Sequence, residues 1–542
     1  MCYSSCNFVN RTNYLDRNDY DITYYIFIRT ILIPLVAKES LFQPNITKKG
    51  KKIVKYDIVI IGSGLGGLEC GYILSKKGLK VCVLERANLL GGCLQSFHRG
   101  NCLFDTGFHY VGGLDEGQSL NRLFKYFNLM NLDWVKMDNN FDDVCIDGKI
   151  YPFVSGHENF RETLSSYFPH QKENLKKYTD FLQNVGINTF DSFKPHSKNN
   201  FYSSSLFAQS AHEFLNSTIT DPILRDVLAG TSLKMELSEQ LPLYVFTQIN
   251  DSFIQSAWRL QGGGFQIAES LANSIIEMGG EVRKNAAVTR LIETNGRITS
   301  VEINNNEYID CDWVISNAHP IHTLSLIPEE SILRKVYRNR INRMENTFGV
   351  FTANIKLKSG SIKYKNKNLY AYQNADLWKY TEGKTDRALV NFYRPQNGDS
   401  CDCLDILTPM NWSEVEAWSD KPIGKRGEDY VAMKNRKTSE CIKLVSHYIP
   451  ELEEAVERAY TSTPLSYKNY TNTANGSAYG IRKDFNSPML TILPPKTPIP
   501  NLLMTGQNLN LHGILGVSMT SFFTCAEIVG MDTLIKDLNI NE

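Results

Sequence analysis

The sequence has no excess of either charge. Its 542 residues include 58 Lys and Arg and 58 Asp and Glu, so the formal net charge at pH 7 is zero. Proteins that bind nucleic acid present a basic face to the phosphates, and a balanced composition offers none. Basic runs such as Lys48–Lys52 are short and typical of a solvated surface. We therefore expect no nucleic-acid partner.

Long hydrophobic runs are also missing. The segment Tyr24–Ala37 is apolar but is interrupted by Arg29, and it is shorter than the roughly 20 residues that span a bilayer. Mixed charges precede it, whereas a signal peptide starts with a basic region. We expect residues 1–52 to be an extension, or translated sequence upstream of a start near Lys52, in preference to an interfacial anchor.

Cysteines lack the paired spacing of a metal site. The 12 cysteines are scattered, and the closest pair, Cys401 and Cys403, has no matching second pair. Such a pattern predicts no bound metal. It also suits a reducing compartment, so we expect a cytoplasmic protein.

A glycine-rich turn follows the first strong strand pattern. Residues 57–67 read DIVIIGSGLGG, in which Tyr56–Ile61 is typical of a strand buried in a parallel sheet. Gly62, Gly64 and Gly67, with Leu65 and Gly66 between them, fit G-x-G-x-x-G. In that motif the glycines permit a tight turn, approach to a pyrophosphate and close helix packing.

The residues that follow complete a dinucleotide-binding unit. Residues 65–77 have helical spacing and end at Gly78, and a second strand is predicted over 80–84. Glu85 then lies where a carboxylate accepts hydrogen bonds from ribose, while the pyrophosphate lies at the helix N-terminus. We predict a bound dinucleotide.

The next residues favour a flavin over a nicotinamide. Glu85, Arg86, Gly91 and Gly92 resemble the E-R-x-x-x-x-G-G continuation of glutathione-reductase-like flavoproteins, which implies FAD. Cys93 follows this glycine pair. Amine-oxidase-type flavoenzymes commonly carry arginine there, and a thiol cannot replace its guanidinium.

Two later stretches return to flavoprotein-like sequence. WRLQGGGF at 258–265 precedes a predicted helix over 266–278, strand-like pieces over 281–303 and a strand over 313–316. Residues 502–530 predict a strand, a glycine loop and a helix.

Several motifs together now identify a family resemblance. GSGLGGLECGYILSKKG, ERANLLGGCLQSF, FDTGFHYVGG, ISNAHP, TPLSYKNYTNTANGSAYGI and TGQNLNLHGILGV resemble the phytoene desaturase-like flavoproteins, and within them the retinol saturase and carotenoid isomerase branch. The resemblance runs from about Lys55 to the C-terminus. It implies an α/β protein with a glutathione-reductase-like FAD-binding Rossmann fold, assembled from discontinuous segments, and an inserted α+β substrate domain.

The resemblance also implies boundaries and further cofactor contacts. The expected organisation is an extension at 1–52, FAD-binding segments at 53–115, 257–325 and 465–542, and substrate-domain parts at 116–256 and 326–464. Val288 is expected to touch adenine through its backbone or to be a core valine. Gly506, Gly513, Gly516 and Val517 are expected beside the flavin.

The implied activity is hydride transfer at flavin N5 to or from the C=C or CH–CH bonds of a hydrophobic isoprenoid polyene, with NAD(P)H as a transient reductant. Alternatives within the family are carotenoid isomerisation and desaturation. An amine-oxidase-type enzyme is a second class, which Cys93 disfavours. A non-enzymatic prenyl-binding relative is a third, which need not keep the intact glycine turn and Glu85.

His109 and Tyr110, in FDTGFHYVGG, are the candidate proton donors, because saturating a double bond needs a proton as well as a hydride. The alternative is that they only hydrogen-bond the flavin. His319 and His512 are expected to be ordinary loop histidines. Phe201–Ile219 and Leu241–Trp258 have helical spacing and many apolar side chains, which suits an oily tunnel and peripheral contact with the inner face of a membrane.

Overall fold

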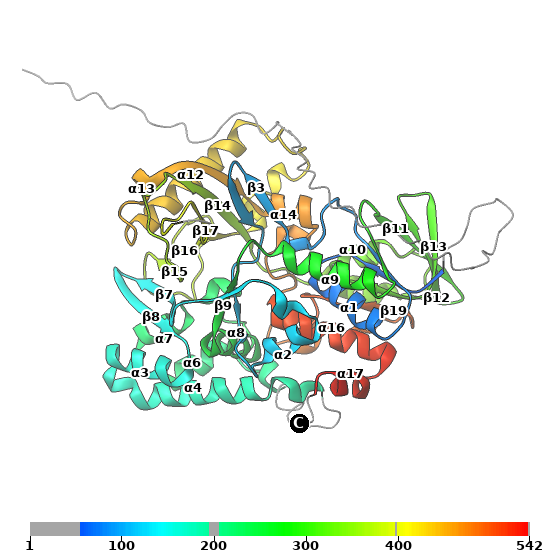
Figure 1. The fold of residues 1–542 in the computed structure, drawn as a ribbon, viewed down its shortest axis with the longest axis horizontal. Coiled ribbons are helices and arrows are strands. Elements are labelled where there is room, and N and C mark those ends of the chain that lie inside the picture. Colours follow the sequence, from blue (N-terminus) through cyan, green and yellow to red (C-terminus); the bar gives the residue numbers. More distant parts are fainter. Residues whose placement is uncertain (1–54, 194–204, 396–397, 540–542) are drawn as a thin grey trace, which may run out of the picture.

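The computed structural model describes residues 55–193, 205–395 and 398–539 (Figure 1). The predictions for residues 1–52, including Tyr24–Ala37, lie outside these ranges. The described chain forms two lobes, each built on a seven-stranded sheet. Within the described ranges, no helix is both long enough and apolar enough to cross a bilayer.

The first sheet draws its strands from three distant stretches of the chain. Their order is β10-β2-β1-β13-β12-β11, and β19 pairs with β13. β1 is parallel to β2 and β13, whereas β11, β12 and β13 are antiparallel neighbours. The bounds are β1 (Lys55–Ile61), β2 (Val81–Leu84), β10 (Glu281–Arg283), β11 (Val288–Thr294), β12 (Arg297–Ile303), β13 (Glu307–Ser316) and β19 (Leu502–Met504).

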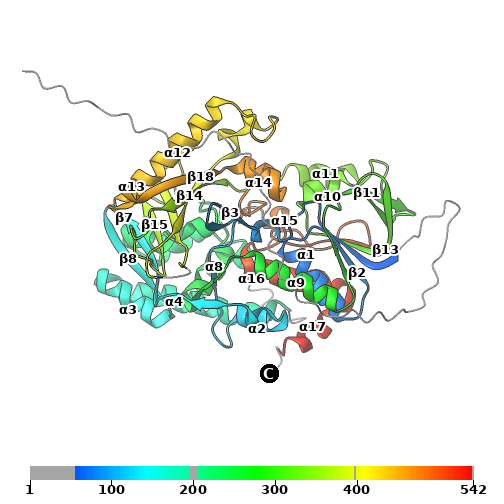
Figure 2. The ribbon, with the colours of Figure 1, turned by 45° about the horizontal axis from the view of Figure 1, so that its top comes forward.

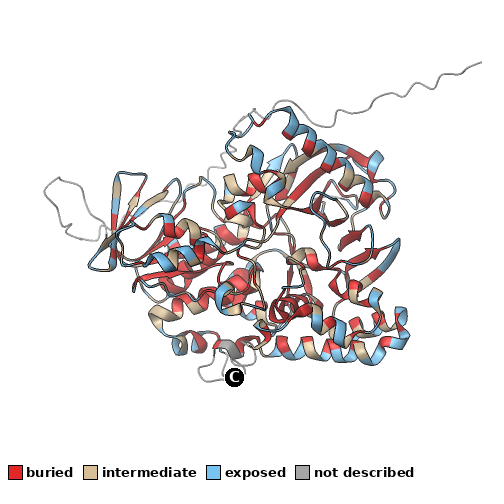
Figure 3. Ribbon diagram, turned by 180° about the vertical axis from the view of Figure 1, so that it is seen from behind, coloured by how far each residue is buried: buried red, intermediate tan, exposed pale blue. Residues whose placement is uncertain are grey.

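β1 is apolar along its length because both of its faces are covered. Ile58 and Ile60 pack into the cluster beneath the helices, whereas Val59 and Ile61 pack into the cluster on the opposite face. This alternation is the period of a β-strand. Figure 3 shows the buried strands between more exposed helical surfaces. The covering helices are α1 (Leu65–Lys76), α9 (Phe265–Glu277) and α16 (Gly513–Val529).

Most predicted elements are found close to their expected bounds. The strand, helix and strand around the glycine turn are β1, α1 and β2, and the later helix over 266–278 is α9. One prediction is wrong at its end. The helical spacing over Leu241–Trp258 stops in α8 (Leu243–Gln255), and Trp258 lies in strand β9 (Ala257–Leu260). Backbone pairing of Trp258 with Val111 and Lys136 overrides the helical pattern.

The second sheet forms the other lobe in the order β18-β14-β17-β16-β15-β7-β8. β15 and β7 are parallel and the other neighbours are antiparallel. The bounds are β7 (Asn140–Ile146), β8 (Lys149–Val154), β14 (Gly349–Leu357), β15 (Asn368–Tyr372), β16 (Arg387–Phe392), β17 (Cys403–Met410) and β18 (Val456–Ser462).

Helices cover both faces of this sheet, so its core is divided between two apolar clusters. α12 (Glu428–Ser446) packs on one face, and a helical layer packs on the other (Figure 1). That layer consists of α3 (His157–Tyr167), α4 (Lys172–Ile187), α6 (Ala211–Thr218), α7 (Pro222–Ala229) and α8. Of the predicted segment Phe201–Ile219, residues 205–219 are described and contain α6.

Short elements join the lobes. β5 (Val111–Gly112), β9 and β6 (Trp134–Lys136) form a three-stranded sheet, and β3 (Ser96–Arg99) pairs with β4 (Cys102–Asp105). In Figure 2, α14 lies between α12 of one lobe and α10 and α11 of the other. The bounds of the remaining helices are α2 (Ser119–Tyr126), α10 (Pro320–Ser325), α11 (Lys335–Asn342), α13 (Leu452–Ala455), α14 (Pro464–Thr471), α15 (Pro488–Thr491) and α17 (Met531–Asp537).

Candidate functional site

A cavity of about 550 Å³ is lined by residues of both lobes. Its volume lies within the range of small-molecule sites, about 300–1,000 Å³. The glycine turn after β1 contributes to its wall, and so do Val350, Leu389 and Leu407 of the second sheet. The predicted site residues that line it are Gly62, Gly64, Leu65, Gly66, Glu85, Arg86, Gly92, Cys93, His109, Tyr110, Val288, Gly506, Gly516 and Val517.

Gly67, the remaining predicted cofactor residue, has a different position. A Cβ on Gly67 would lie 2.1 Å from the carbonyl oxygen of Gly62, so any side chain would prevent α1 from packing against the turn. Gly62 itself has φ +91°, a left-handed conformation that favours glycine. Gly67 therefore shapes the turn from behind.

Glu85 holds the glycine turn as well as lining the cavity. Its Oε2 accepts hydrogen bonds from the backbone N of Ser63 (3.0 Å) and from Ser63 Oγ (2.7 Å). Its Oε1 accepts one from the backbone N of Ala87 at 2.9 Å. A carboxylate oxygen accepts about two hydrogen bonds, so Oε1 retains capacity for a further donor such as a ribose hydroxyl.

The glycine pair after β2 packs against the glycine turn that precedes α1. The backbone N of Gly91 donates to Ser63 O at 3.0 Å, and a Cβ on Gly92 would be 3.4 Å from Gly64 Cα. Next to them, burial raises the pKa of the Cys93 thiol, which therefore stays protonated. Arg86 is exposed and donates to Asn469 O at 3.0 Å, so it fastens α14 to the rim of the cavity.

Asn317, at the end of β13, joins the glycines of two segments. A Cβ on Gly64 would lie 2.6 Å from Asn317 Nδ2, and one on Gly506 would lie 2.4 Å from Asn317 Oδ1. The glycines at these positions are thus required by the Asn317 side chain. Sequence reasoning placed Asn317 in the ISNAHP motif without giving it a role.

The loop before α16 is held by a buried lysine that the sequence did not reveal. Lys483 Nζ donates to the carbonyls of Thr491 (2.8 Å), Asn508 (2.7 Å) and Leu509 (2.9 Å). Burial lowers its pKa to about 7. Three carbonyl contacts fix the path of the loop that carries Gly506 to the cavity.

His109 enters the cavity wall with both ring nitrogens buried. Neither Nδ1 nor Nε2 has a hydrogen-bond partner among the described residues. Burial, and then the charge of Arg259, lower its pKa to about 4, so the imidazole is neutral at pH 7. Buried polar groups are usually paired, so these nitrogens are available to a ligand.

Tyr110, by contrast, has its hydroxyl engaged within the protein. The hydroxyl donates to Asp142 Oδ2 at 2.8 Å and shares a 2.6 Å hydrogen bond with the hydroxyl of Tyr370. Burial, with the charge of Asp142, raises the pKa of Tyr110 well above 10. Lys234 lies 3.5 Å from the same carboxylate oxygen. We call these four residues the Lys234 cluster.

Of the two loop histidines, each has a partner as expected. His319 Nε2 bonds Asn346 Oδ1 at 2.8 Å, and its Nδ1 accepts from the backbone N of Ile321 at 3.3 Å. His512 Nε2 donates to the carbonyl of Lys234 at 3.1 Å. Both line the cavity, and so does Val288 at the start of β11.

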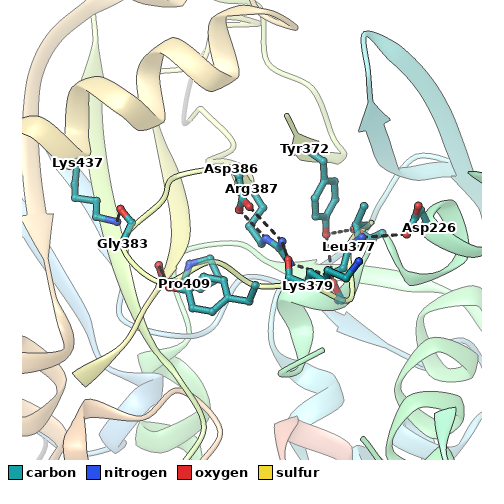
Figure 4. Close-up of polar contacts among 12 residues, drawn as sticks. Asp226, Tyr372, Leu377, Lys379, Gly383, Asp386, Arg387, Pro409 and Lys437 are labelled. Carbon is teal, nitrogen blue, oxygen red and sulfur yellow. Dashed lines mark hydrogen bonds and ion pairs between the residues drawn. The ribbon is translucent and has the colours of Figure 1, made fainter. Parts of the chain in front are cut away.

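Pro409, on β17, belongs to a wall of the cavity that a firmly held loop supports (Figure 4). The hydroxyl of Tyr380, in the loop between β15 and β16, donates to Pro409 O at 3.5 Å. Arg387 donates to the carbonyl of Leu377 at 2.8 Å, and the backbone N of Leu377 donates to Asp226 at 3.0 Å. The helical layer and the sheet of the second lobe thus both fix the loop, which favours a preformed wall.

This lining fits a dinucleotide cofactor. The first turns of α1 and α16 have no capping side-chain hydrogen bond among the residues described, so their backbone N–H groups remain to bind an anion. The glycines leave a smooth cradle there, Glu85 has a lone pair free on Oε1, and His109 presents unpaired nitrogens.

Comparison with known proteins supports this assignment. Residues 60–127 match the family model of an NAD(P)-binding Rossmann-like domain. The chain is 27% identical to all-trans-retinol 13,14-reductase of Rattus norvegicus over 533 residues, covering 89% of this chain and 87% of that protein. It is 24% identical to the chloroplastic prolycopene isomerase of Daucus carota, covering 79% and 72%.

A solved structure of wild-type putrescine oxidase bound to putrescine shares the fold, with a TM-score of 0.58 and 14% identity over 88% of this chain and 99% of that one. The α/β fold and the resemblance predicted from the motifs are confirmed. This chain is therefore similar, over most of its length, to the all-trans-retinol 13,14-reductases and prolycopene isomerases.

Proposed function

We propose that this chain binds FAD and catalyses redox chemistry at the C=C or CH–CH bonds of a hydrophobic isoprenoid polyene. The observation that carries the proposal is the shared cavity, which joins the glycine turn and Glu85 to the apolar residues Val350, Leu389 and Leu407. The names of the relatives, which refer to retinol and to prolycopene, support the substrate class.

Bound FAD supplies a hydride acceptor or donor at its N5. The chain's own residues hold and align the reactants. Gly64 and Gly66 line the cavity at the start of α1, where the helix N-terminus would hold the pyrophosphate. Glu85 accepts from the ribose, and Gly506 and Gly516 line the cavity beside them. The apolar wall excludes water and fixes the polyene by burial, since a hydrocarbon chain offers no polar handle.

His109 and Tyr110 are the proposed proton donors. Among the described residues the nitrogens of His109 have no partner, whereas the Tyr110 hydroxyl donates to Asp142. His109→Ala or Tyr110→Phe should leave the flavin bound and reducible but slow turnover about 10²–10⁴-fold. Stopped-flow traces of the reduced variants mixed with polyene measure this, and wild-type rates in both would remove the catalytic role.

The function is tested by purifying the protein, recording its flavin spectrum and following anaerobic reoxidation of the reduced protein. Retinol, a carotene, a quinone and putrescine serve as probes, and NAD(P)H serves as the proposed transient reductant. Reoxidation by a polyene supports the proposal. Reduction of the oxidised protein by putrescine, with no response to any polyene, would assign it to the amine-oxidase class instead.

We also propose a cytoplasmic protein with peripheral contact to a membrane, because its substrate dissolves there. In cell fractionation, mild detergent or salt should release it. Resistance to carbonate extraction would contradict this and would point to an integral anchor.

A further inference from the structure

The Lys234 cluster places a buried cation in the wall of the cavity. Lys234 ends a short helical turn, its side chain is 8% exposed, and it lines the cavity. Its Nζ lies 3.9 Å from the ring centroid of Phe253, which also lines the cavity. Asp142 Oδ2, at 3.5 Å, is the one carboxylate oxygen within ion-pair distance of it among the described residues.

The Asp142 carboxylate accepts hydrogen bonds from several donors, so it balances the positive charge of Lys234 poorly. Its Oδ2 accepts from Tyr110 at 2.8 Å and its Oδ1 from Asn368 Nδ2 at 2.9 Å. The charge of the same carboxylate also acts on a second buried cation, Arg259. The guanidinium of Arg259 bonds the neutral side chains of Asn368 and Asn391.

Two buried cations thus depend on one buried carboxylate. In the part of the chain that the structure describes, Asp142 is the one Asp or Glu within 4.0 Å of Lys234, and none lies that close to Arg259. An uncompensated buried charge is costly, and proteins normally satisfy it with a counter-ion or ligand. Because Lys234 lines the cavity, a ligand there can supply the missing negative charge.

A purely hydrocarbon ligand would make this imbalance worse. It would cover the ammonium of Lys234 and offer no acceptor to its N–H groups. An anionic oxygen on the ligand would instead accept those hydrogen bonds and balance the charge, and charge-assisted hydrogen bonds of this kind are the strong ones.

We propose that Lys234 binds the carboxylate end group of the substrate, so that the preferred ligand is a long apolar polyene that ends in an acid. The inference deepens the proposed polyene chemistry and rests on it for the identity of the apolar part. Lys234 acts here as a specificity-determining residue, with Asp142, Tyr110 and Tyr370 holding its position.

The test measures ligand affinity of the flavin-bound protein by equilibrium dialysis. All-trans-retinoic acid, all-trans-retinol and the hydrocarbon with the same chain and a terminal methyl group are the probes. Wild type should bind the acid most tightly. Lys234→Met should lower the affinity for the acid about 10- to 100-fold, as expected for loss of a charged hydrogen bond. The affinity for the hydrocarbon should not change.

Two further variants guard against misfolding. Lys234→Met combined with Asp142→Asn removes both members of the ion pair and should show the same selective loss of affinity for the acid. Lys367→Met is the matched control: Lys367 pairs with the neighbouring Asp143 at 2.5 Å and does not line the cavity, so affinities should not change.

Equal binding of acid and hydrocarbon by wild type would overturn the inference. An equal loss of affinity for all three probes in Lys234→Met would also overturn it. So would loss of flavin from that variant, because the charge of Lys234 would then serve the cofactor. The proposed function fails separately: acid binding that depends on Lys234, with no polyene reoxidising the reduced flavin, would refute the polyene chemistry and leave this site standing.

Discussion

Replacing His109 by phenylalanine should stabilise the flavin-free protein and at the same time lower its affinity for FAD. The imidazole is buried in the cavity wall, and its two nitrogens have no partner among the described residues. The flavin-free protein therefore bears the cost of desolvating them, and the bound cofactor is expected to recover it. Phenylalanine keeps the planar ring without the polar atoms.

The magnitude follows from the hydrogen bonds that are missing. Each buried polar group without a partner costs about 1–3 kcal/mol, so removing the imidazole should raise the free energy of unfolding of the flavin-free protein by at least that amount. With an unfolding entropy of about 2.1 cal/mol/K per residue, this corresponds to a rise in Tm of roughly 1–3 °C for a chain of this length. FAD affinity should fall about 2- to 10-fold, the value of a neutral hydrogen bond.

The effect should also depend on pH. Burial lowers the folded-state pKa of His109 to about 4 from its ordinary 6.5, so the unfolded chain takes up the proton first. Wild type therefore loses stability as pH falls from 6.5 towards 4, whereas His109→Phe lacks this loss. The stability difference between variant and wild type should widen over that window.

Thermal unfolding of the flavin-free proteins and titration with FAD, followed by flavin fluorescence, measure the two effects. His319→Phe is the matched control, because that buried ring bonds Asn346 and Ile321, and its loss should lower stability by about 1–3 kcal/mol. The reasoning is refuted if the flavin-free His109→Phe protein unfolds at or below the wild-type temperature while His319→Phe behaves as expected.

Three further substitutions test the cofactor site and its support. Glu85→Gln turns one acceptor into a donor opposite a backbone N–H, so the dissociation constant of FAD should rise about 10- to 100-fold; full flavin retention after dialysis would contradict this. Lys483→Met leaves three carbonyls without their donor and should release flavin from the loosened loop, as absorbance after gel filtration reports; unchanged flavin content would show that the loop holds without it. Glu69 lies in α1 and accepts hydrogen bonds from Ser518 and Ser521 of α16, which joins these two helices beside the cavity. Burial raises the pKa of Glu69 to about 8, so the folded state keeps a proton that the unfolded chain loses above about pH 4.5. Wild-type stability therefore falls from there towards pH 8. Glu69→Gln should therefore reduce the difference in the free energy of unfolding between pH 5 and pH 8, as measured by urea unfolding. An equal difference in variant and wild type would contradict the burial argument.

The cofactor half of the site could be predicted from the sequence because its signals are local. The apolar run of β1, the glycine turn and Glu85 lie within some thirty residues, and each follows from backbone conformation or strand periodicity. The prediction at Trp258 is wrong for the opposite reason. Its local spacing is helical, but pairing with Val111 and Lys136 places it in a strand.

The sequence by itself determined the βαβ unit, the glycine positions and the acidic residue after β2, since these depend on neighbours along the chain. Only the tertiary structure decided that Asn317 fills the space between Gly64 and Gly506, that Lys483 holds the loop that carries Gly506, and that the charge of Asp142 acts on both Lys234 and a second buried cation. These contacts join elements far apart in the chain, and charge balance in a buried site depends on which side chains meet there, which no local pattern records.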